Sequence, residues 1–267
     1  MLKTKSIARI VRVMGYGMSC PIHIIADDDK DYILKTKIVT LDGNENVQIS
    51  AKELFAEIFS YIYLKTLNAS YIPNACLLDV TDETLQLVQK FANGSEREKQ
   101  ALQNLTHSEG LNLGVEYIKD ANKIFSINDF SQDFIKKTIN YDARLMNTDR
   151  DVENPNILQD LSDKKWLIDF GLAFDTLILF DNFNSTTGLF SETANETYFD
   201  KCCFVTYIFD ENIRKNTTLL KDTISSGTIK NIVDYVCGVI NLLDNSQKIH
   251  LAQIIERRQN SKRILCA

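Results

Sequence analysis

Three residues with oxygen-bearing side chains lie within about 20 residues of one another in the second half of the chain. Asp149 is followed five residues later by Asn154, and Asp169 ends a short apolar run inside an Asp-Phe-Gly sequence. Mg²⁺ is a hard cation that prefers oxygen ligands and takes few of them from a protein. Phosphoryl transfer from ATP needs such a metal, together with a carboxylate that orients or deprotonates the attacking hydroxyl. The ordered set therefore predicts metal-dependent phosphoryl transfer.

The residues around this set separate it from a chance pair. Asp149 and Asn154 could by themselves simply stabilise a turn, as Asp and Asn commonly do. A hairpin of residues 156–159 and 165–169 fits between Asn154 and Asp169, and its apolar second strand would hold Asp169 rigidly. We therefore predict that Asp149 is the catalytic carboxylate and that Asn154 and Asp169 are magnesium ligands.

A lysine on the nucleotide phosphates is expected in a strand of the N-terminal part. Lys35 follows the apolar run Tyr32-Ile33-Leu34 in a predicted strand at residues 31–37. Lys37 has the same facing, because side chains alternate along a strand with a period of two. The apolar run favours Lys35 as the phosphate-binding residue, against the alternative of a solvated strand lysine.

A carboxylate on a nearby helix would orient that lysine. Residues 50–67 carry apolar residues at helical spacing, and Glu53 and Glu57 lie four residues apart on one face of this predicted helix. Either glutamate could pair with Lys35, or remain a solvated helix carboxylate. We prefer Glu57 because it lies among apolar neighbours.

A glycine-containing segment joins the first two predicted strands. Gly15 and Gly17 could let the backbone N–H groups of residues 15–21 cover the phosphates of a nucleotide. Tight-turn geometry would explain the two glycines equally well. Ser19 could contact a phosphate or itself be phosphorylated.

The composition is that of a globular protein in a reducing compartment. The 267 residues are 44% hydrophobic and 25% charged, with a net charge of −6 that argues against bulk nucleic-acid binding. The six cysteines lack a C-x-x-C spacing and the three histidines are scattered, which disfavours a disulfide framework and a zinc site. The sequence shows neither the apolar stretch of a signal peptide nor a membrane-spanning run, so we expect a cytoplasmic protein without membrane contact.

Hydrophobic periodicity predicts an α+β fold with two lobes. Residues 1–92 are expected to form a small β-rich N-lobe with one helix, and residues 93–267 a mostly helical C-lobe, with the hinge at residues 92–95. The expected elements are strands at 7–14, 21–26, 31–37, 76–80 and 84–91, a capping box at 126–129, the hairpin, a polar loop at 175–190, and helices near 193–215 and 228–257.

With these parts in place, the chain resembles the HipA-like kinases, relatives of a bacterial toxin that phosphorylates a protein on serine. The resemblance covers residues 7–174 and is most specific in Asn147-Thr148-Asp149-Arg150 with Asn154, and in Trp166-Leu167-Ile168-Asp169-Phe170-Gly171. It implies a protein-kinase-like fold, ATP and Mg²⁺ as cofactors, and a Ser or Thr hydroxyl of a protein as the acceptor. It also implies the roles given above to Asp149, Asn154, Asp169 and Lys35.

The chain departs from this family in two places. Asp151 stands where many members have His, and the glycine segment begins near residue 15 without the extra N-terminal subdomain of the toxin kinases. We therefore expect a short, core-only form of the family, in which toxin activity and an antitoxin or other regulatory partner are open. Two alternatives also stay open, a kinase of a small molecule and a non-catalytic nucleotide-binding regulatory module.

Overall fold

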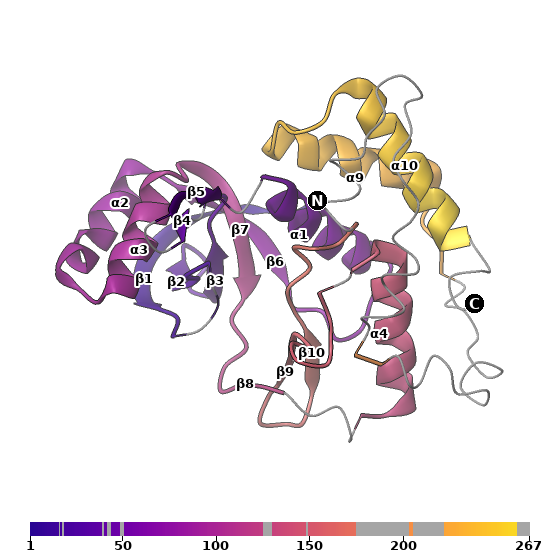
Figure 1. Cartoon of the computed structure of the whole chain (residues 1–267), viewed down its shortest axis with the longest axis horizontal. Helices are drawn as coiled ribbons and strands as arrows, with labels where there is room; N and C mark the ends of the chain where they lie inside the picture. Colours follow the sequence, from indigo (N-terminus) through magenta and orange to yellow (C-terminus); the bar gives the residue numbers. More distant parts are fainter. Residues whose placement is uncertain are drawn as a thin grey trace. The chain divides into compact units, whose positions relative to one another are not determined.

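Alternating apolar residues place five strands of the N-terminal part in a closed barrel. In β3 (Asp31–Lys35), Tyr32 and Leu34 are buried while the other three residues are partly exposed, as the two-residue period of a strand requires. The barrel order is β1-β2-β3-β7-β6, with β1 and β6 parallel and all other neighbours antiparallel (Figure 1). The other strands are β1 (Thr4–Val13), β2 (Ile22–Ala26), β6 (Ala75–Val80) and β7 (Gly110–Glu116).

The computed structural model describes residues 1–15, 17, 19–38, 40–41, 44–48, 51–124, 130–147, 149–174, 203–204 and 222–260. The chain divides into two compact units, one of Met1–Leu54 and Pro73–Lys119 and the other of Phe55–Ile72 and Asp120–Ala267. Helices and strands both contribute, which agrees with the expected α+β class. The division differs from the expected ranges, because residues 93–119 belong to the β-rich unit and most of the helix at 51–66 does not.

The prediction of a strand at residues 84–91 is wrong, because α2 (Asp82–Val88) and the 3₁₀-helix η1 (Gln89–Asn93) occupy this segment. The Thr81 side chain accepts from the Thr84 N–H and starts α2 in a capping box. Val88 and Phe91 are buried, and their spacing of three matches one helical face, whereas Leu87 is exposed. The alternating apolar residues that predicted a strand are therefore distributed over a helix.

The first unit continues through a helix where the hinge was expected. Gly94 caps the end of η1, and Ser95 caps α3 (Glu96–Thr106) through a reciprocal bond with Glu98. The chain then enters β7, which pairs with both β3 and β6. A two-stranded sheet of β4 (Thr40–Leu41) and β5 (Asn44–Gln48) completes the unit.

The second unit is built around two apolar helices and a small sheet. Helix α1 (Ala51–Thr66) buries a continuous row of residues, and α4 (Gln132–Leu145) buries all residues from Thr138 to its end. The sheet has the order β10-β9-β8, formed by β8 (Asn122–Lys123), β9 (Ile157–Gln159) and β10 (Lys165–Leu167). Strands β9 and β10 confirm the expected hairpin within a residue or two at each end.

Two helices near the C-terminus account for the helical pattern expected near 228–257. These are α9 (Ser226–Val239) and α10 (Asn245–Asn260), and they pack against each other. The N-cap of α4 is Ser131, whose hydroxyl accepts from the Phe134 N–H. The expected capping box at 126–129 and loop at 175–190 lie outside the described residues, and of the helix expected near 193–215 the structure describes only residues 203–204.

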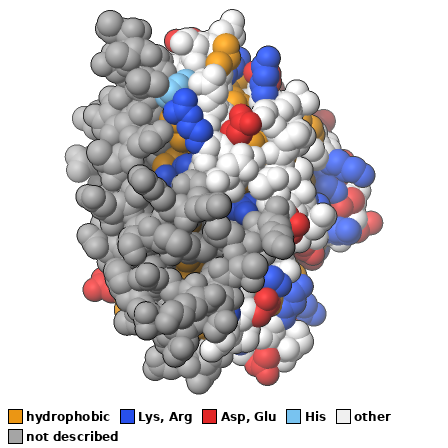
Figure 2. All heavy atoms as spheres, turned by 90° about the vertical axis from the view of Figure 1, so that its right-hand side faces the viewer, with side chains coloured by type: hydrophobic (Ala, Val, Ile, Leu, Met, Phe, Trp, Pro, Cys, Tyr) orange, Lys and Arg blue, Asp and Glu red, His pale blue; other side chains and the backbone are white. Residues whose placement is uncertain are grey.

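None of the helices in the described part of the chain is long and apolar enough to cross a membrane. On the face shown in Figure 2, basic and acidic side chains are intermixed over the described surface. This mixed pattern is typical of a solvated surface.

Candidate functional site

A buried arginine organises the segment that carries Asp149. Arg150 is 1% exposed, and its Nε donates to Oδ2 of Asp142 on α4 at 2.7 Å. Its Nη1 donates to the carbonyl oxygens of Pro155 at 2.9 Å and Asn156 at 2.7 Å, and both terminal nitrogens reach the Ile168 carbonyl oxygen at 3.4 Å. One side chain thus ties α4, the turn before β9 and the end of β10 together.

The Asp142 carboxylate is the counter-charge of this arrangement. Asp142 is fully buried and accepts from Arg150 on one oxygen and from Nδ2 of Asn147 on the other, at 2.9 Å. Burial raises the pKa of Asp142, and the donors Arg150 and Asn147 oppose that rise. Asn147 in turn accepts from the Asp149 N–H at 3.4 Å, which extends the buried network to the candidate catalytic residue.

Asp149 is held by a second amide. Nδ2 of Asn156 donates to Oδ2 of Asp149 at 2.9 Å, while Asn156 itself has a left-handed backbone with φ of 50°. Asn is among the few residue types that adopt this conformation readily. Asp149 stays partly exposed, so its carboxylate is oriented by the protein and still accessible to a substrate.

The environment of Asp149 raises its affinity for a proton. The pKa of Asp149 is raised to about 6, first by desolvation and then by the negative charge of Asp169. A carboxylate with a pKa close to neutrality is a better general base than an unperturbed one. The charge of Asp169 thus acts on Asp149, as expected for two carboxylates of one site.

Backbone bonds fix the position of Asp169 at the end of β10. The Leu167 N–H donates to the Tyr71 carbonyl oxygen at 2.7 Å, and the Ile168 N–H donates to that of Asn156 at 3.0 Å. Asp169 then takes a left-handed φ of 62°, which turns the chain sharply. Phe170 follows as a fully buried ring that packs edge-on against Tyr61 of α1 and beneath the Arg150 guanidinium.

Asn154 lies in the same unit, at the start of the turn into β9. Its N–H donates to Oδ1 of Asp151 at 2.6 Å, so the residue that departs from the family pattern caps this turn. The side-chain oxygen of Asn154 accepts from Nζ of Lys123 on β8 at 2.5 Å. The oxygen predicted to bind magnesium therefore already attracts a cation.

These residues suit a magnesium ion by their chemistry. Asn154 and Asp169 supply hard oxygen ligands. The negative charge of Asp169 contributes to the raised pKa of Asp149, and a bound cation would offset this repulsion between the two carboxylates. Among the described residues there is no group of three or more His, Cys, Asp or Glu able to hold a metal. Mg²⁺ commonly uses only one or two carboxylates and completes its shell with water and substrate phosphates.

The predicted phosphate-binding residues are placed in their elements. Lys35 ends β3 opposite Leu113 of β7 and is partly exposed. Lys37 turns elsewhere, because its Nζ donates to the Glu109 carbonyl oxygen and its N–H to Oδ1 of Asn112 at 2.9 Å. The choice of Lys35 over Lys37 as the phosphate-binding lysine stays a prediction. Glu57, on α1, is 3% exposed, in keeping with its apolar neighbours. The pairing of Lys35 with Glu57 stays a prediction.

The glycine-containing segment forms a closed loop that α3 holds in place. The Met14 N–H donates to the Pro21 carbonyl oxygen at 2.9 Å, and Gly17 has a φ of 87°, which only glycine adopts without strain. Nε of Arg97 donates to the Met14 carbonyl oxygen at 2.5 Å, and Nη2 of Arg97 donates to that of Gly17. At Gly15 an added methyl group would meet no atom of the described residues within 4 Å apart from its chain neighbours, so crowding does not require a glycine there.

Ser19 completes this loop. Nδ2 of Asn104 donates to the Ser19 carbonyl oxygen at 3.5 Å, so α3 holds the loop at a third point. The position of Ser19 in a loop between β1 and β2 is compatible with the predicted phosphate contact, which stays a prediction.

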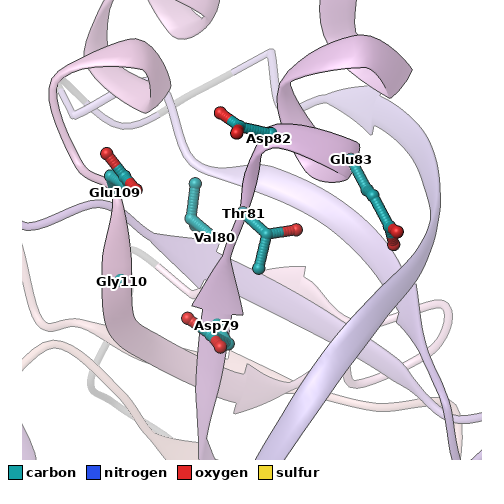
Figure 3. A pocket seen from close by; sticks show the side chains of 7 residues that line it. All are labelled: Asp79, Val80, Thr81, Asp82, Glu83, Glu109 and Gly110. Atoms are coloured by element: carbon teal, nitrogen blue, oxygen red, sulfur yellow. The ribbon is translucent and has the colours of Figure 1, made fainter.

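A cavity of about 710 Å³ lies elsewhere in the first unit, at the end of β6 and the start of β7. Its acidic lining comes from Asp79, Asp82, Glu83 and Glu109. Figure 3 shows that these carboxylates come from β6, from the start of α2 and from the residue before β7, and that they point in different directions. None of the predicted catalytic or cofactor-binding residues lines it, and we assign it no role in phosphoryl transfer.

Sequence reasoning named Arg150 only as part of a motif and missed Asp142, Asn156 and Lys123. Asn156 lies two residues after Asn154, and its left-handed conformation before a strand is a signal that Asn residues often give. Asp142 and Lys123 carry no local signal, because their partners are eight and 31 residues away in the sequence.

No protein-family model matches the chain, and no curated protein is similar to it in sequence. Similar solved structures include the Golgi casein kinase, with a TM-score of 0.46 and 14% identity over 98% of this chain and 72% of that chain. The Golgi casein kinase with Mn/ADP bound has a TM-score of 0.45 and 12% identity over 98% and 73%. A MAP kinase from Leishmania major has a TM-score of 0.32 and 13% identity over 96% and 81%. These similarities are low, so the function proposed below rests on the residues of this chain.

Proposed function

We propose that this chain is a kinase that uses ATP and Mg²⁺ to phosphorylate a hydroxyl, with Ser or Thr of a protein as the acceptor. The observation that carries the proposal is the state of Asp149. The residue is partly exposed, Asn156 donates to its carboxylate at 2.9 Å, and desolvation together with the charge of Asp169 raises its pKa to about 6. A turn-stabilising aspartate would need none of these features.

In the proposed reaction, Asp149 accepts the proton of the acceptor hydroxyl. The hydroxyl oxygen bonds to the γ-phosphorus of ATP, and the bond between the γ-phosphorus and the leaving ADP oxygen breaks. Asn156 and the network through Asn147 keep the carboxylate in position for this step. Asn154 and Asp169 would hold Mg²⁺, which when bound neutralises phosphate charge.

The nucleotide contacts complete the proposal. Lys35 would bind the phosphates, with Glu57 as its orienting carboxylate, and the loop with Gly15, Gly17 and Ser19 would cover them through backbone N–H groups. The HipA-like assignment, and with it an antitoxin or other regulatory partner in the cytoplasm, rests on the sequence resemblance described above.

The test is incubation of purified protein with Mg²⁺ and γ-labelled ATP, with and without a protein extract, for wild type, Asp149→Ala and Asp163→Asn. Asp163 is an exposed residue of the β9–β10 turn and serves as the matched control. We expect label on Ser or Thr for wild type and the control, and at least about a 10²-fold loss for Asp149→Ala, the scale of general-base catalysis.

Mass spectrometry locates the label and separates the alternatives. Label confined to a small molecule would indicate the other kinase class. ATP binding without transfer to any acceptor would indicate a non-catalytic module. Full turnover by Asp149→Ala would rule out its assignment as the base.

A further inference from the structure

Lys123 occupies a fixed place beside the candidate site. It lies on β8, the edge strand of the β10-β9-β8 sheet, opposite Leu158 of β9. The bond from the Ile124 N–H to the Ile157 carbonyl oxygen, at 2.9 Å, fixes the backbone beyond it. The side chain is partly exposed and reaches back along β9 to Asn154, where Nζ donates to Oδ1 at 2.5 Å.

The partner of Lys123 makes this contact informative. Asn154 Oδ1 is the oxygen that the proposed function assigns to the metal, and it presents its negative end to the ammonium group. Magnesium binds oxygen ligands at about 2 Å. A metal ion and an ammonium group on one amide oxygen would be close neighbours of like charge, which repel. The two cations would therefore replace each other at Asn154.

A lysine displaced from Asn154 has an evident next partner. A metal held by Asn154 and Asp169 would bring the phosphates of the nucleotide to this site, where their anionic oxygens could accept from Nζ of Lys123. The flexible four-carbon stem of lysine and its three rotatable donors suit such an exchange.

We propose that Lys123 is a phosphate-binding residue of this kinase, which rests on Asn154 without nucleotide and transfers to the nucleotide phosphates when the metal binds. This inference depends on the proposed function. It adds the ammonium group of Lys123 to the proposed nucleotide site, and this residue belongs neither to the strand of Lys35 nor to the motif around Asp149. The ligand class is the polyphosphate of a nucleoside di- or triphosphate.

The test compares Lys123→Met, Lys123→Arg and wild type in calorimetric titrations with ATP and Mg²⁺, with adenosine, and with Mn²⁺ alone. Lys165→Met is the matched control, because Lys165 lies on β10 of the same sheet and its Nζ donates to the Asp163 carbonyl oxygen at 3.1 Å. Trp166 fluorescence verifies that each variant keeps the folded sheet.

For Lys123→Met we expect about tenfold weaker binding of ATP with Mg²⁺, the scale of a lost hydrogen bond to a charged group, and unchanged binding of adenosine. Lys123→Arg should restore part of the loss, and Lys165→Met should bind like wild type. Mn²⁺ alone should bind Lys123→Met more tightly than wild type, because the competing ammonium group is gone.

Different results overturn different claims. Equal ATP affinity of Lys123→Met and wild type would overturn the phosphate role, and an equal loss for adenosine would show a merely structural one. Unchanged Mn²⁺ binding would overturn the exchange at Asn154. A wild-type protein that binds neither ATP nor Mn²⁺ would instead overturn the proposed function itself.

Discussion

The buried pair of Arg150 and Asp142 offers the sharpest test of how the candidate site is held. In Arg150→Met, the guanidinium is removed while the Asp142 carboxylate stays fully buried with only Asn147 as a described donor. The carbonyl oxygens of Pro155 and Asn156 also lose the donor that holds them at 2.9 and 2.7 Å. The variant therefore combines a lost ion pair with a weakened turn before β9.

The expected magnitude follows from the burial of both partners. Removing one member of a buried ion pair costs about 3–5 kcal/mol, because the other charge is left without compensation. On the same helix, Lys137 and Asp133 form a pair at 2.9 Å that is substantially exposed to solvent. Lys137→Met should therefore cost no more than about 1 kcal/mol, and it is the matched control.

The chain contains one tryptophan, Trp166, which makes the assay local. Trp166 lies on β10, two residues before the Ile168 carbonyl oxygen that Arg150 contacts, and its Nε1 donates to Asp160 at 2.9 Å. Urea unfolding followed by its fluorescence thus reports on the unit that contains the pair. For Arg150→Met we expect the midpoint to fall by about 1–2 M at an unchanged slope.

A double variant decides the physical reason. The double variant Asp142→Leu with Arg150→Met has neither charge of the buried pair. Its loss in free energy of unfolding should therefore be smaller than the sum of the losses of the two single variants. Losses that simply add, or an Arg150→Met midpoint equal to that of wild type, would refute the view that this pair organises the site.

Four further predictions concern the candidate site and the glycine-containing loop. Asp169→Asn should lower the pKa of Asp149 from about 6 only part of the way, because desolvation is the larger cause, and a carboxyl carbon NMR titration measures the change. The pKa of Asp149 in the folded protein is raised above its unfolded value of 3.8, so the protonated form of Asp149 favours folding. This contribution to the free energy of unfolding should disappear as the pH rises through about 6. Urea midpoints that show the same pH dependence for wild type and Asp149→Asn would contradict it. Asn156→Gly keeps the left-handed backbone but removes the donor to Asp149, so kcat should fall by about tenfold or more with ATP affinity unchanged, in steady-state assays. Arg97→Met frees the carbonyl oxygens of Met14 and Gly17, so the KM for ATP should rise while kcat changes less, and equal effects on both would speak against a loop-positioning role.

The local elements with strong periodicity were predictable from the sequence. The strands around Tyr32 and the helix at 51–66 follow from alternating and helical apolar spacing, and the β9–β10 hairpin from a turn between two short apolar runs. The segment at 84–91 was mispredicted because its apolar residues also fit a helix. Only the Thr81 capping box and the burial of Val88 and Phe91 distinguish the two.

The candidate site divides in the same way. The types and order of Asp149, Asn154 and Asp169 determine by themselves which chemistry to expect, because oxygen ligands and a carboxylate base are what metal-dependent phosphoryl transfer requires. The tertiary structure alone decides the pKa and the contacts of these residues. Burial and the charge of Asp169 shift the Asp149 pKa, and Lys123 reaches Asn154 across a sheet from 31 residues away. Desolvation and contacts between distant residues depend on how the chain is packed, and no local sequence pattern encodes them.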